Sequence, residues 1–329
     1  MLTEAPAPRL LLGTREGLLA LRLSPDGEGW TVAEVLWRHA AVRAIAVDPD
    51  DPRRLHLAAA GDGIYRSEDG GRTWERYLHV DAHVLVVRPD RPELLYLGAK
   101  PAEVFRSTDF GGHWTALGIT QGIGEPLTPL TEWHHVRTMV FDPANGAAIH
   151  AVVEGGGLLA TFDGGRSWVE LATRGLPAAP DCLLHVGGTD NVLIAGTAQG
   201  ILRSEDHGFH WQADGAGIVE SAIVSLTAAG DHLIAAAADP SAGSESQRSR
   251  LYHRPPGTAR WWPAGEPIAG RVQALHAAPL TAPPAWRDTV FAATDDGSLW
   301  RAIQHGRAWN RMTRGLPPAT ALAWQPPAN

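Results

Sequence analysis

One eight-residue pattern occurs four times in the chain and constrains its fold more than any other feature. The pattern is Ser/Thr-x-Asp-x-Gly-x-x-Trp, with these four residue types at the same offsets in every copy. The copies are residues 67–74, 107–114, 161–168 and 204–211. Degraded versions end at Trp30, Trp261 and Trp309, so successive tryptophans of the series lie 40 to 54 residues apart. A repeat of that length is typical of one blade of a β-propeller.

The pattern itself predicts a tight turn between two strands. The aspartate carboxylate can accept hydrogen bonds from backbone N–H groups of the turn, and the glycine supplies a positive φ. The tryptophan packs over the turn as the next strand begins. We therefore interpret the following residues as structural: Asp69, Trp74, Asp109, Trp114, Asp163, Trp168, Asp206 and Trp211.

The composition supports an all-β fold. The 36 glycines and 25 prolines make up 61 of the 329 residues, about 19% against an average near 12%. Few windows longer than about 15 residues are free of both, which argues against helical bundles and α/β barrels. The exception, residues 32–47, has polar side chains that do not keep to one helical face. We predict strand, turn, strand there.

Each repeat divides into four strands, a to d, and the turn pattern joins c to d. The a-strands are expected at residues 42–47, 83–87, 136–141, 182–186, 222–226, 272–276 and 319–324. The chain begins with a b–c–d set and ends with an a-strand. We therefore expect residues 1–329 to form a single seven-bladed propeller with a 1+3 closure, in which residues 319–324 complete the first blade. Such a ring leaves no large open sheet edge.

The repeated pattern resembles the Asp-box of BNR-repeat proteins. This group includes sialidases, tandem-propeller xyloglucanases, sortilin-type receptors and the photosystem II assembly-factor propellers. The four full and three degraded copies extend the resemblance over nearly the whole chain. It implies a propeller fold but selects no function, because enzymes and non-enzymes share the motif.

The longest loops predict which face of the ring binds a ligand. Strand direction alternates, so a–b and c–d loops lie on one face and b–c and d–a loops on the other. The long loops at residues 118–133 and 239–250 fall on the face opposite the Asp-box turns, and a smaller insertion at 277–287 falls on the Asp-box face. Elaborated loops on a rigid ring usually carry the binding site.

Charged residues and histidines collect where the a-strands begin on that elaborated face. Aligning the repeats places Arg43, His83 and Arg137 at one equivalent position, while Asp81 and His135 share another. The first interpretation is a pocket for a polar or anionic ligand. Its candidate binding residues are Arg43, Arg137, Lys100 and Asp81.

Two other interpretations of this region stay open. One is a divalent metal centre, because imidazole and carboxylate are common metal ligands. Its candidate ligands are His79, His83, His134 and His135, with Asp81 and Glu132 as carboxylates. The other is a solvated rim. Two adjacent histidines in a strand project to opposite sides, so we expect His135 rather than His134 to face the channel.

The sequence favours a binding protein over an enzyme. The resemblance to sialidases would imply an arginine triad and a tyrosine–glutamate pair around the channel, and these signatures are not found. A tandem xyloglucanase would need a second propeller. Carboxylate chemistry stays open, with Glu132, Glu154 and His135 as catalytic candidates. We expect a small polar or anionic ligand or a protein segment to bind, with a hydrolase or lyase at the same mouth as the alternative.

Net charge and cysteine content give further expectations. The formal charge of −8 argues against general affinity for nucleic acid or an anionic membrane. The single cysteine cannot form an intrachain disulfide, and no apolar run approaches the roughly 20 residues of a membrane span. The first residues lack the features of a signal peptide. We expect a cytoplasmic monomer.

Overall fold

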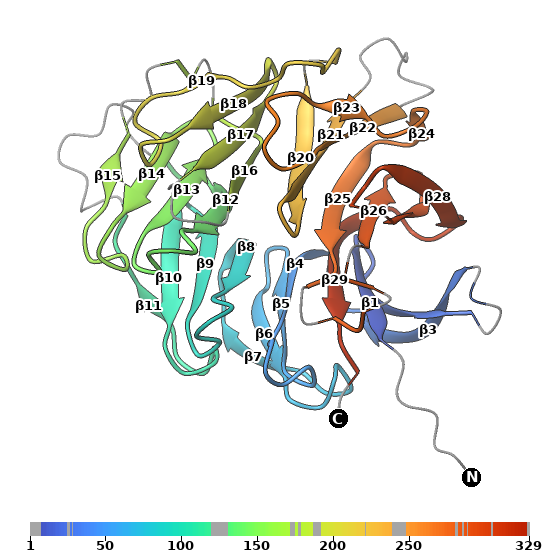
Figure 1. The fold of residues 1–329 in the computed structure, drawn as a ribbon. Coiled ribbons are helices and arrows are strands. Elements are labelled where there is room, and N and C mark those ends of the chain that lie inside the picture. Colours follow the sequence, from blue (N-terminus) through green and yellow to red (C-terminus); the bar gives the residue numbers. More distant parts are fainter. Residues whose placement is uncertain are drawn as a thin grey trace.

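The computed structural model describes most of the chain. The described residues are 8–24, 27, 29–119, 131–171, 175–176, 179–186, 192–220, 222–238, 248–279, 282–284, 286–287, 289–303 and 305–327. Every regular element within these ranges is a strand, so no helix among them is long and apolar enough to cross a membrane. The strands form seven antiparallel sheets arranged as blades around a ring (Figure 1). The predicted all-β, seven-bladed propeller is confirmed.

The blades are numbered here in chain order. Blade 1 contains β29 (Ala319–Gln325), β1 (Arg9–Thr14), β2 (Leu18–Leu23) and β3 (Trp30–Trp37). Blade 2 contains β4 (Val42–Val47), β5 (Leu55–Ala59), β6 (Gly63–Ser67) and β7 (Glu75–Leu78). Blade 3 contains β8 (Asp81–Val87), β9 (Leu95–Lys100), β10 (Glu103–Ser107) and β11 (Thr115–Ala116). Blade 4 contains β12 (Val136–Phe141), β13 (Ile149–Val153), β14 (Gly157–Thr161) and β15 (Val169–Glu170).

The remaining blades follow the same order. Blade 5 contains β16 (Cys182–His185), β17 (Leu193–Thr197), β18 (Gly200–Ser204) and β19 (Gln212–Ala213). Blade 6 contains β20 (Ile223–Ala229), β21 (His232–Ala238), β22 (Arg248–Arg254) and β23 (Trp262–Pro263), with β24 (Ile268–Ala269) also paired to β22. Blade 7 contains β25 (Val272–Ala277), β26 (Val290–Thr294), β27 (Leu299–Ile303) and β28 (Ala308–Thr313).

The ring closes through the C-terminal strand. β29 pairs antiparallel with β1, with Leu10 opposite Trp324 and Leu12 opposite Leu322. Figure 1 shows the first and last strands side by side in one blade. This is the predicted 1+3 closure, and it pairs the edge that β1 would otherwise expose.

The core lies between neighbouring blades, which explains the apolar second strand of each blade. All five residues of β5 are buried. Leu55 and Leu57 pack toward blade 1, whereas Ala58 belongs to the apolar cluster shared with blade 3. Because both faces of such a strand are covered, apolar residues occupy consecutive positions rather than alternate ones.

The turns formed by the repeated Ser/Thr-x-Asp-x-Gly-x-x-Trp pattern, called Asp-box turns here for their resemblance to that motif, are held by their aspartates. Asp163 Oδ1 accepts hydrogen bonds from the backbone nitrogens of Arg166 and Ser167 at 2.8 and 3.0 Å. Gly165 has φ 88° and Trp168 is buried. A side chain at Gly165 would also press on the neighbouring blade, where Leu117 Cδ1 lies 2.4 Å from the position of an added Cβ. The motif therefore shapes the turn and lets adjacent blades approach.

Parts of the long loops lie outside the described residues. These parts are residues 120–130 of the 118–133 loop, 239–247 of the 239–250 loop, and residues 280, 281 and 285 of the 277–287 insertion.

Candidate functional site

The inner strands of six blades carry a β-bulge near one end. In β4, Val42 pairs with Ala59 and Ala44 pairs with Ala58, which leaves Arg43 without a cross-strand partner. The same shift occurs in the inner strands of blades 1, 3, 4, 6 and 7. The bulged residues are Arg43, His83, Arg137, Val224, Gln273 and Thr320. Bulges re-aim side chains at the rims of sheets and next to functional sites.

Bulged residues of blades 2 and 3 meet at this end of the channel. Arg43 Nη1 lies 2.6 Å from His83 Nδ1, and Arg43 Nη2 lies 3.6 Å from Asp81 Oδ1. Asp81 also accepts a hydrogen bond from the backbone nitrogen of Gly61 at 2.8 Å. The His83 ring packs against the His135 ring of the next blade, with ring centroids 4.2 Å apart. Contacts therefore run without a break from blade 2 to blade 4.

The contacts continue from blade 4 to blade 5. Glu154 Oε2 lies 3.3 Å from His135 Nε2 and accepts hydrogen bonds from Arg137 Nε and Nη2 at 2.9 and 2.6 Å. Arg137 also donates to Asp181, which immediately precedes β16. We call this region the charged mouth. Its members are Arg43, Asp81, His83, Lys100, His135, Arg137, Glu154 and Asp181.

The protonation states of the charged mouth follow from burial and its arginines. Burial lowers the pKa of His83 to about 4, and the positive charge of Arg43 acts in the same direction. Burial also lowers the pKa of His135, so both imidazoles are neutral near pH 7. Burial opposes the ionisation of Glu154, but hydrogen bonds from Arg137 outweigh it and lower the pKa of that carboxyl.

The same balance applies to Asp81. Burial raises the pKa of its carboxyl, but the Gly61 N–H group and Arg43 outweigh this effect, so the pKa is lowered. The charged mouth therefore holds three cationic and three anionic side chains. Because these charges cancel, the region is polar rather than strongly basic.

Lys100 and Trp133 form an exposed pair beside this network. Lys100 lies opposite Asp81 in the strand register, and its Nζ is 5.3 Å from the centroid of the Trp133 ring. Trp133 is 73% exposed. Tryptophan is enriched among the anchor residues of protein interfaces.

The structure brings some of the predicted site residues together and separates others. Of the four candidate metal-binding histidines, His83 and His135 contact each other. His134 Nδ1 instead accepts a hydrogen bond from the backbone nitrogen of Thr131 at 2.7 Å, and His79 lies within electrostatic range of Asp62. Across the residues described, no group of three or more His, Cys, Asp or Glu side chains is arranged to hold a metal ion.

The candidate carboxylate pair is also divided. Glu132 is exposed near the end of its loop, whereas Glu154 is held by Arg137 and His135. Sequence reasoning missed Asp181 altogether. The inner strand of blade 5 is not followed by an Asp-Pro or Arg-Pro turn like those of blades 2, 3 and 4, so the signal in the sequence was the position of Asp181 directly before a short apolar strand.

A cavity of about 580 Å³ opens at the opposite end of the channel. Its wall consists of the ends of β4, β8, β12, β16, β25 and β29 and the turns that follow them. Most of these residues are aliphatic, aromatic or proline. We call this region the apolar mouth. It lies on the Asp-box face, whereas the long loops predicted a binding site on the opposite face.

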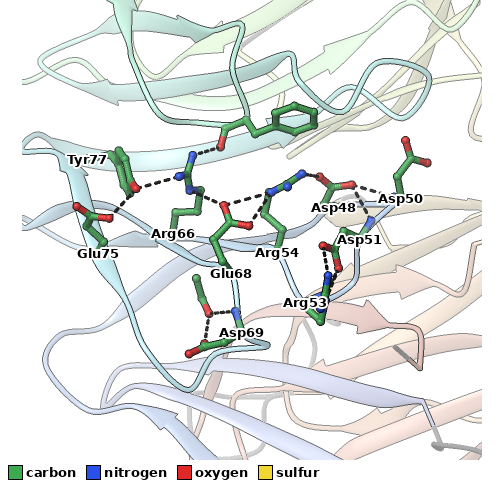
Figure 2. Close-up of polar contacts among 12 residues, drawn as sticks. Asp48, Asp50, Asp51, Arg53, Arg54, Arg66, Glu68, Asp69, Glu75 and Tyr77 are labelled. Carbon is green, nitrogen blue, oxygen red and sulfur yellow. Dashed lines mark hydrogen bonds and ion pairs between the residues drawn. The ribbon is translucent and has the colours of Figure 1, made fainter. Parts of the chain in front are cut away.

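Beside the apolar mouth, a network of ion pairs ties the a–b turn of blade 2 to its Asp-box turn (Figure 2). Asp48 Oδ2 accepts a hydrogen bond from Arg54 Nη1 at 2.7 Å. Arg54 also pairs with Glu68 at 3.1 Å, and Glu68 pairs with Arg66 at 2.9 Å. Arg66 then donates to the hydroxyl of Tyr77 at 2.9 Å. The carboxylate of Asp48 is thus compensated by a neighbouring cation.

Comparison with known proteins bears on the fold. No protein-family model and no curated protein sequence matches the chain. Among solved structures, it is similar to the GH74 xyloglucanase from Xanthomonas campestris, with 21% identity, a TM-score of 0.66, and coverage of 94% of this chain and 53% of that one. An ancestral GH74 enzyme matches at 15% identity and a TM-score of 0.61, covering 87% of this chain and 38% of that one.

A single propeller of comparable length is also similar. The structure of YCF48 bound to D1 peptide matches at 14% identity and a TM-score of 0.59, covering 88% of this chain and 93% of that one. The chain spans about half or less of the length of the two GH74 enzymes. At these identities the similarity establishes a shared seven-bladed propeller fold.

Proposed function

We propose that this chain is a propeller of the BNR/Asp-box group that binds a polar ligand at its charged mouth without transforming it. The observation that carries the proposal is the unbroken set of contacts from Arg43 in blade 2 to Asp181 at blade 5. Such a network holds several charged groups in fixed positions before any ligand arrives, which reduces the ordering cost of binding.

The charge balance of the mouth favours a protein segment over a simple anion. Arg137 is already engaged by two carboxylates, Glu154 and Asp181. A ligand with both acidic and basic groups can form ion pairs with the arginines and with the carboxylates of such a network. An isolated anion would be attracted by the arginines but repelled by Asp81 and Glu154. Trp133 beside Lys100 offers an exposed anchor of the kind that dominates interfaces. The peptide in the YCF48 structure supports a segment as the partner.

Hydrolysis at the same mouth is the weaker candidate, favoured by the GH74 enzymes among the similar structures. Glycoside hydrolysis usually needs one carboxylic acid that stays protonated until it donates its proton. The pKa values of Asp81 and Glu154 are both lowered, and the pKa values of His83 and His135 are lowered as well. None of these four groups is therefore a proton donor near pH 7, which supports binding over catalysis.

A divalent metal at the charged mouth is a further proposal of lower rank. Neutral His83 and His135 are in the protonation state that a metal requires. The contact between His83 and the Arg43 guanidinium opposes it, because a second cation would be repelled. Elemental analysis together with thermal melting in EDTA tests this version. A stoichiometric metal and a lower melting temperature in EDTA would favour it.

The binding proposal is tested with a random 12-residue peptide library displayed on phage. Enriched peptides are synthesised and their affinities measured by calorimetry for the wild type, Arg43→Ala and Trp133→Ala. We expect at least a tenfold loss of affinity in each variant, because a hot-spot side chain contributes on the order of 2 kcal/mol. The matched control is Trp262→Ala, which removes another exposed tryptophan from blade 6.

Two results would count against the proposal. One is a library that yields no enriched sequence. The other is an affinity that falls equally in Trp133→Ala and Trp262→Ala. Turnover of polysaccharide substrates by the wild type, lost in Glu154→Gln, would favour the hydrolase instead.

A further inference from the structure

The apolar mouth has the dimensions and rigidity of a small-molecule site. Its volume of about 580 Å³ falls within the roughly 300–1,000 Å³ typical of ligand pockets. Proline residues follow several of the strands that form its wall, and each proline holds its own φ nearly constant. These rim prolines are Pro49, Pro89, Pro143, Pro279 and Pro326. The cavity is thus largely formed before a ligand enters.

One polar pair in the wall is buried and incompletely bonded. The side chains of Asp142 and His185 are 1% and 3% exposed, and Asp142 Oδ2 lies 3.9 Å from His185 Nε2. That distance is too long for a hydrogen bond. Within the described part of the chain, Asp142 Oδ2 and both ring nitrogens of His185 have no hydrogen-bond partner. A buried carboxylate oxygen without a partner calls for an explanation, and a bound molecule that supplies the missing hydrogen bond is one.

Comparison with blade 2 shows what is unusual about Asp142. Asp48 and Asp142 occupy the same position in equivalent turns, and both line the cavity. Each Oδ1 accepts hydrogen bonds from the two backbone nitrogens that follow the proline, at 2.8 and 3.1 Å in both turns. The second oxygen of Asp48 is paired with Arg54 at 2.7 Å. Asp142 has no ion pair with an arginine or lysine among the residues that the structure describes.

The third turn of this type adds no uncompensated charge. Arg88 occupies the equivalent position in blade 3, and its guanidinium forms two hydrogen bonds with Asp90 at 2.7 Å. The remaining charge in the cavity wall is therefore the carboxylate of Asp142. A mostly apolar cavity in which the other charged side chains are ion-paired and one carboxylate is not is complementary to a molecule with an apolar body and one cation.

We propose that the apolar mouth binds small apolar amines, with the ammonium group donating a hydrogen bond to Asp142 Oδ2. A second N–H of the ammonium can be donated to a ring nitrogen of His185. The apolar body then lies against the aliphatic side chains of β4, β8 and β12. This site is distinct from the charged mouth, so neither proposal depends on the other.

Three probes of similar size test the choice of ligand on the wild-type protein. The probes are 2-phenylethylamine, 2-phenylethanol and 3-phenylpropionate, each titrated at pH 7 and followed by calorimetry. We expect the amine to bind at least tenfold more tightly than the alcohol, and the carboxylate to bind most weakly, because Asp142 repels it. Equal affinities for the three probes, or no binding of the amine, would overturn the proposal.

Asp142→Asn and Asp48→Asn form a matched pair of variants. Each amide keeps an oxygen that can accept the backbone hydrogen bonds of its turn, and only the first removes the uncompensated charge. We expect affinity for 2-phenylethylamine to fall at least tenfold in Asp142→Asn and less than about twofold in Asp48→Asn. Melting temperatures of the free variants check that both are folded. An equal loss in both variants, or none in a folded Asp142→Asn, contradicts the assignment.

Discussion

The two ends of the central channel are built from the same inner strands, yet their chemistry differs. β12 illustrates the contrast, because it carries Arg137 at the charged mouth and ends with Phe141 at the apolar mouth. At the first end, bulges direct polar side chains of neighbouring blades at one another. At the other end, apolar side chains and prolines surround a cavity. Within the described residues, the two ends therefore offer different chemistry to a ligand: ion-paired polar side chains at the charged mouth, and a mostly apolar wall with one unpaired carboxylate at the apolar mouth.

The largest expected difference between the two ends concerns tryptophan. Trp324 is buried, and its ring lies 5.3 Å from Trp286 and 6.0 Å from Phe291 between ring centroids. We expect Trp324→Ala to reduce the free energy of unfolding by about 3–5 kcal/mol. Trp133→Ala, beside the charged mouth, is expected to change it by less than about 0.5 kcal/mol. Urea denaturation measures both. Similar losses in the two variants would remove the contrast.

The next largest effect concerns two aspartates on opposite faces of the ring. Asp163 holds its turn through two backbone N–H groups and the hydroxyls of Thr161 and Ser167. Asp163→Ala is expected to cost about 2 kcal/mol of unfolding free energy, since several hydrogen bonds to a charged group are lost. Asp181→Ala removes a half-exposed partner of Arg137 and is expected to cost less than about 1 kcal/mol. A larger loss for Asp181→Ala would mean that the charged mouth supports the fold.

Acid is expected to act on both ends in the same direction. Burial lowers the pKa of His276 at the apolar mouth and of His83 at the charged mouth, each to about 4, from about 6.5 in the unfolded chain. As pH falls from 6.5, the unfolded chain binds protons before the folded chain does. The contribution of these two histidines to the free energy of unfolding is therefore fully present above pH 6.5 and is lost as pH falls toward 4.

Two variants isolate these contributions. The wild type loses unfolding free energy between pH 7 and pH 4.5. We expect this loss to be about 2 kcal/mol smaller in His276→Gln and about 1 kcal/mol smaller in His83→Gln, because the His83 ring is partly exposed. Unfolding free energies measured across this pH range give each value by difference from the wild type. A pH dependence identical to that of the wild type would show that the histidine in question is not responsible.

The smallest expected effect is that of salt on the two proposed sites. Raising NaCl from 50 to 500 mM should weaken binding of a selected peptide at the charged mouth by about threefold, because half-exposed ion pairs are screened. Binding of 2-phenylethylamine should change less, since the Asp142 side chain is 1% exposed. Calorimetric titrations at the two salt concentrations make the comparison. Equal sensitivity would indicate that both ligands bind at exposed charges.

Much of the fold was predictable because its determinants are local and repeated. The expected strands at residues 42–47 and 136–141 coincide with β4 and β12, since an Asp-Pro turn marks the end of each. The strand predicted at 222–226 is longer in the structure, where β20 extends to Ala229. No turn signal of that kind follows it. Propensity alone places strand ends less well than turn chemistry does.

The site was less predictable than the fold. Repeat alignment correctly placed Arg43, His83 and Arg137 at equivalent positions, because each is the bulged residue of its strand. It did not anticipate that Asp181 of blade 5 lies against Arg137, nor that the apolar cavity lies on the Asp-box face. Loop length indicates where chain is added, but it carries no information about where side chains leave space.

The amino-acid sequence by itself determined the number of blades, their strand order and the closure by the C-terminal strand. These features follow from turn motifs and apolar periodicity, which act over a few residues and recur in each repeat. Tertiary structure alone decided which charges neutralise one another and which stay unpaired. Asp48 and Asp142 occupy the same position in equivalent turns, yet only Asp48 pairs with an arginine among the described residues. That difference depends on which side chains reach each oxygen in the folded ring, and spacing along the chain does not specify it.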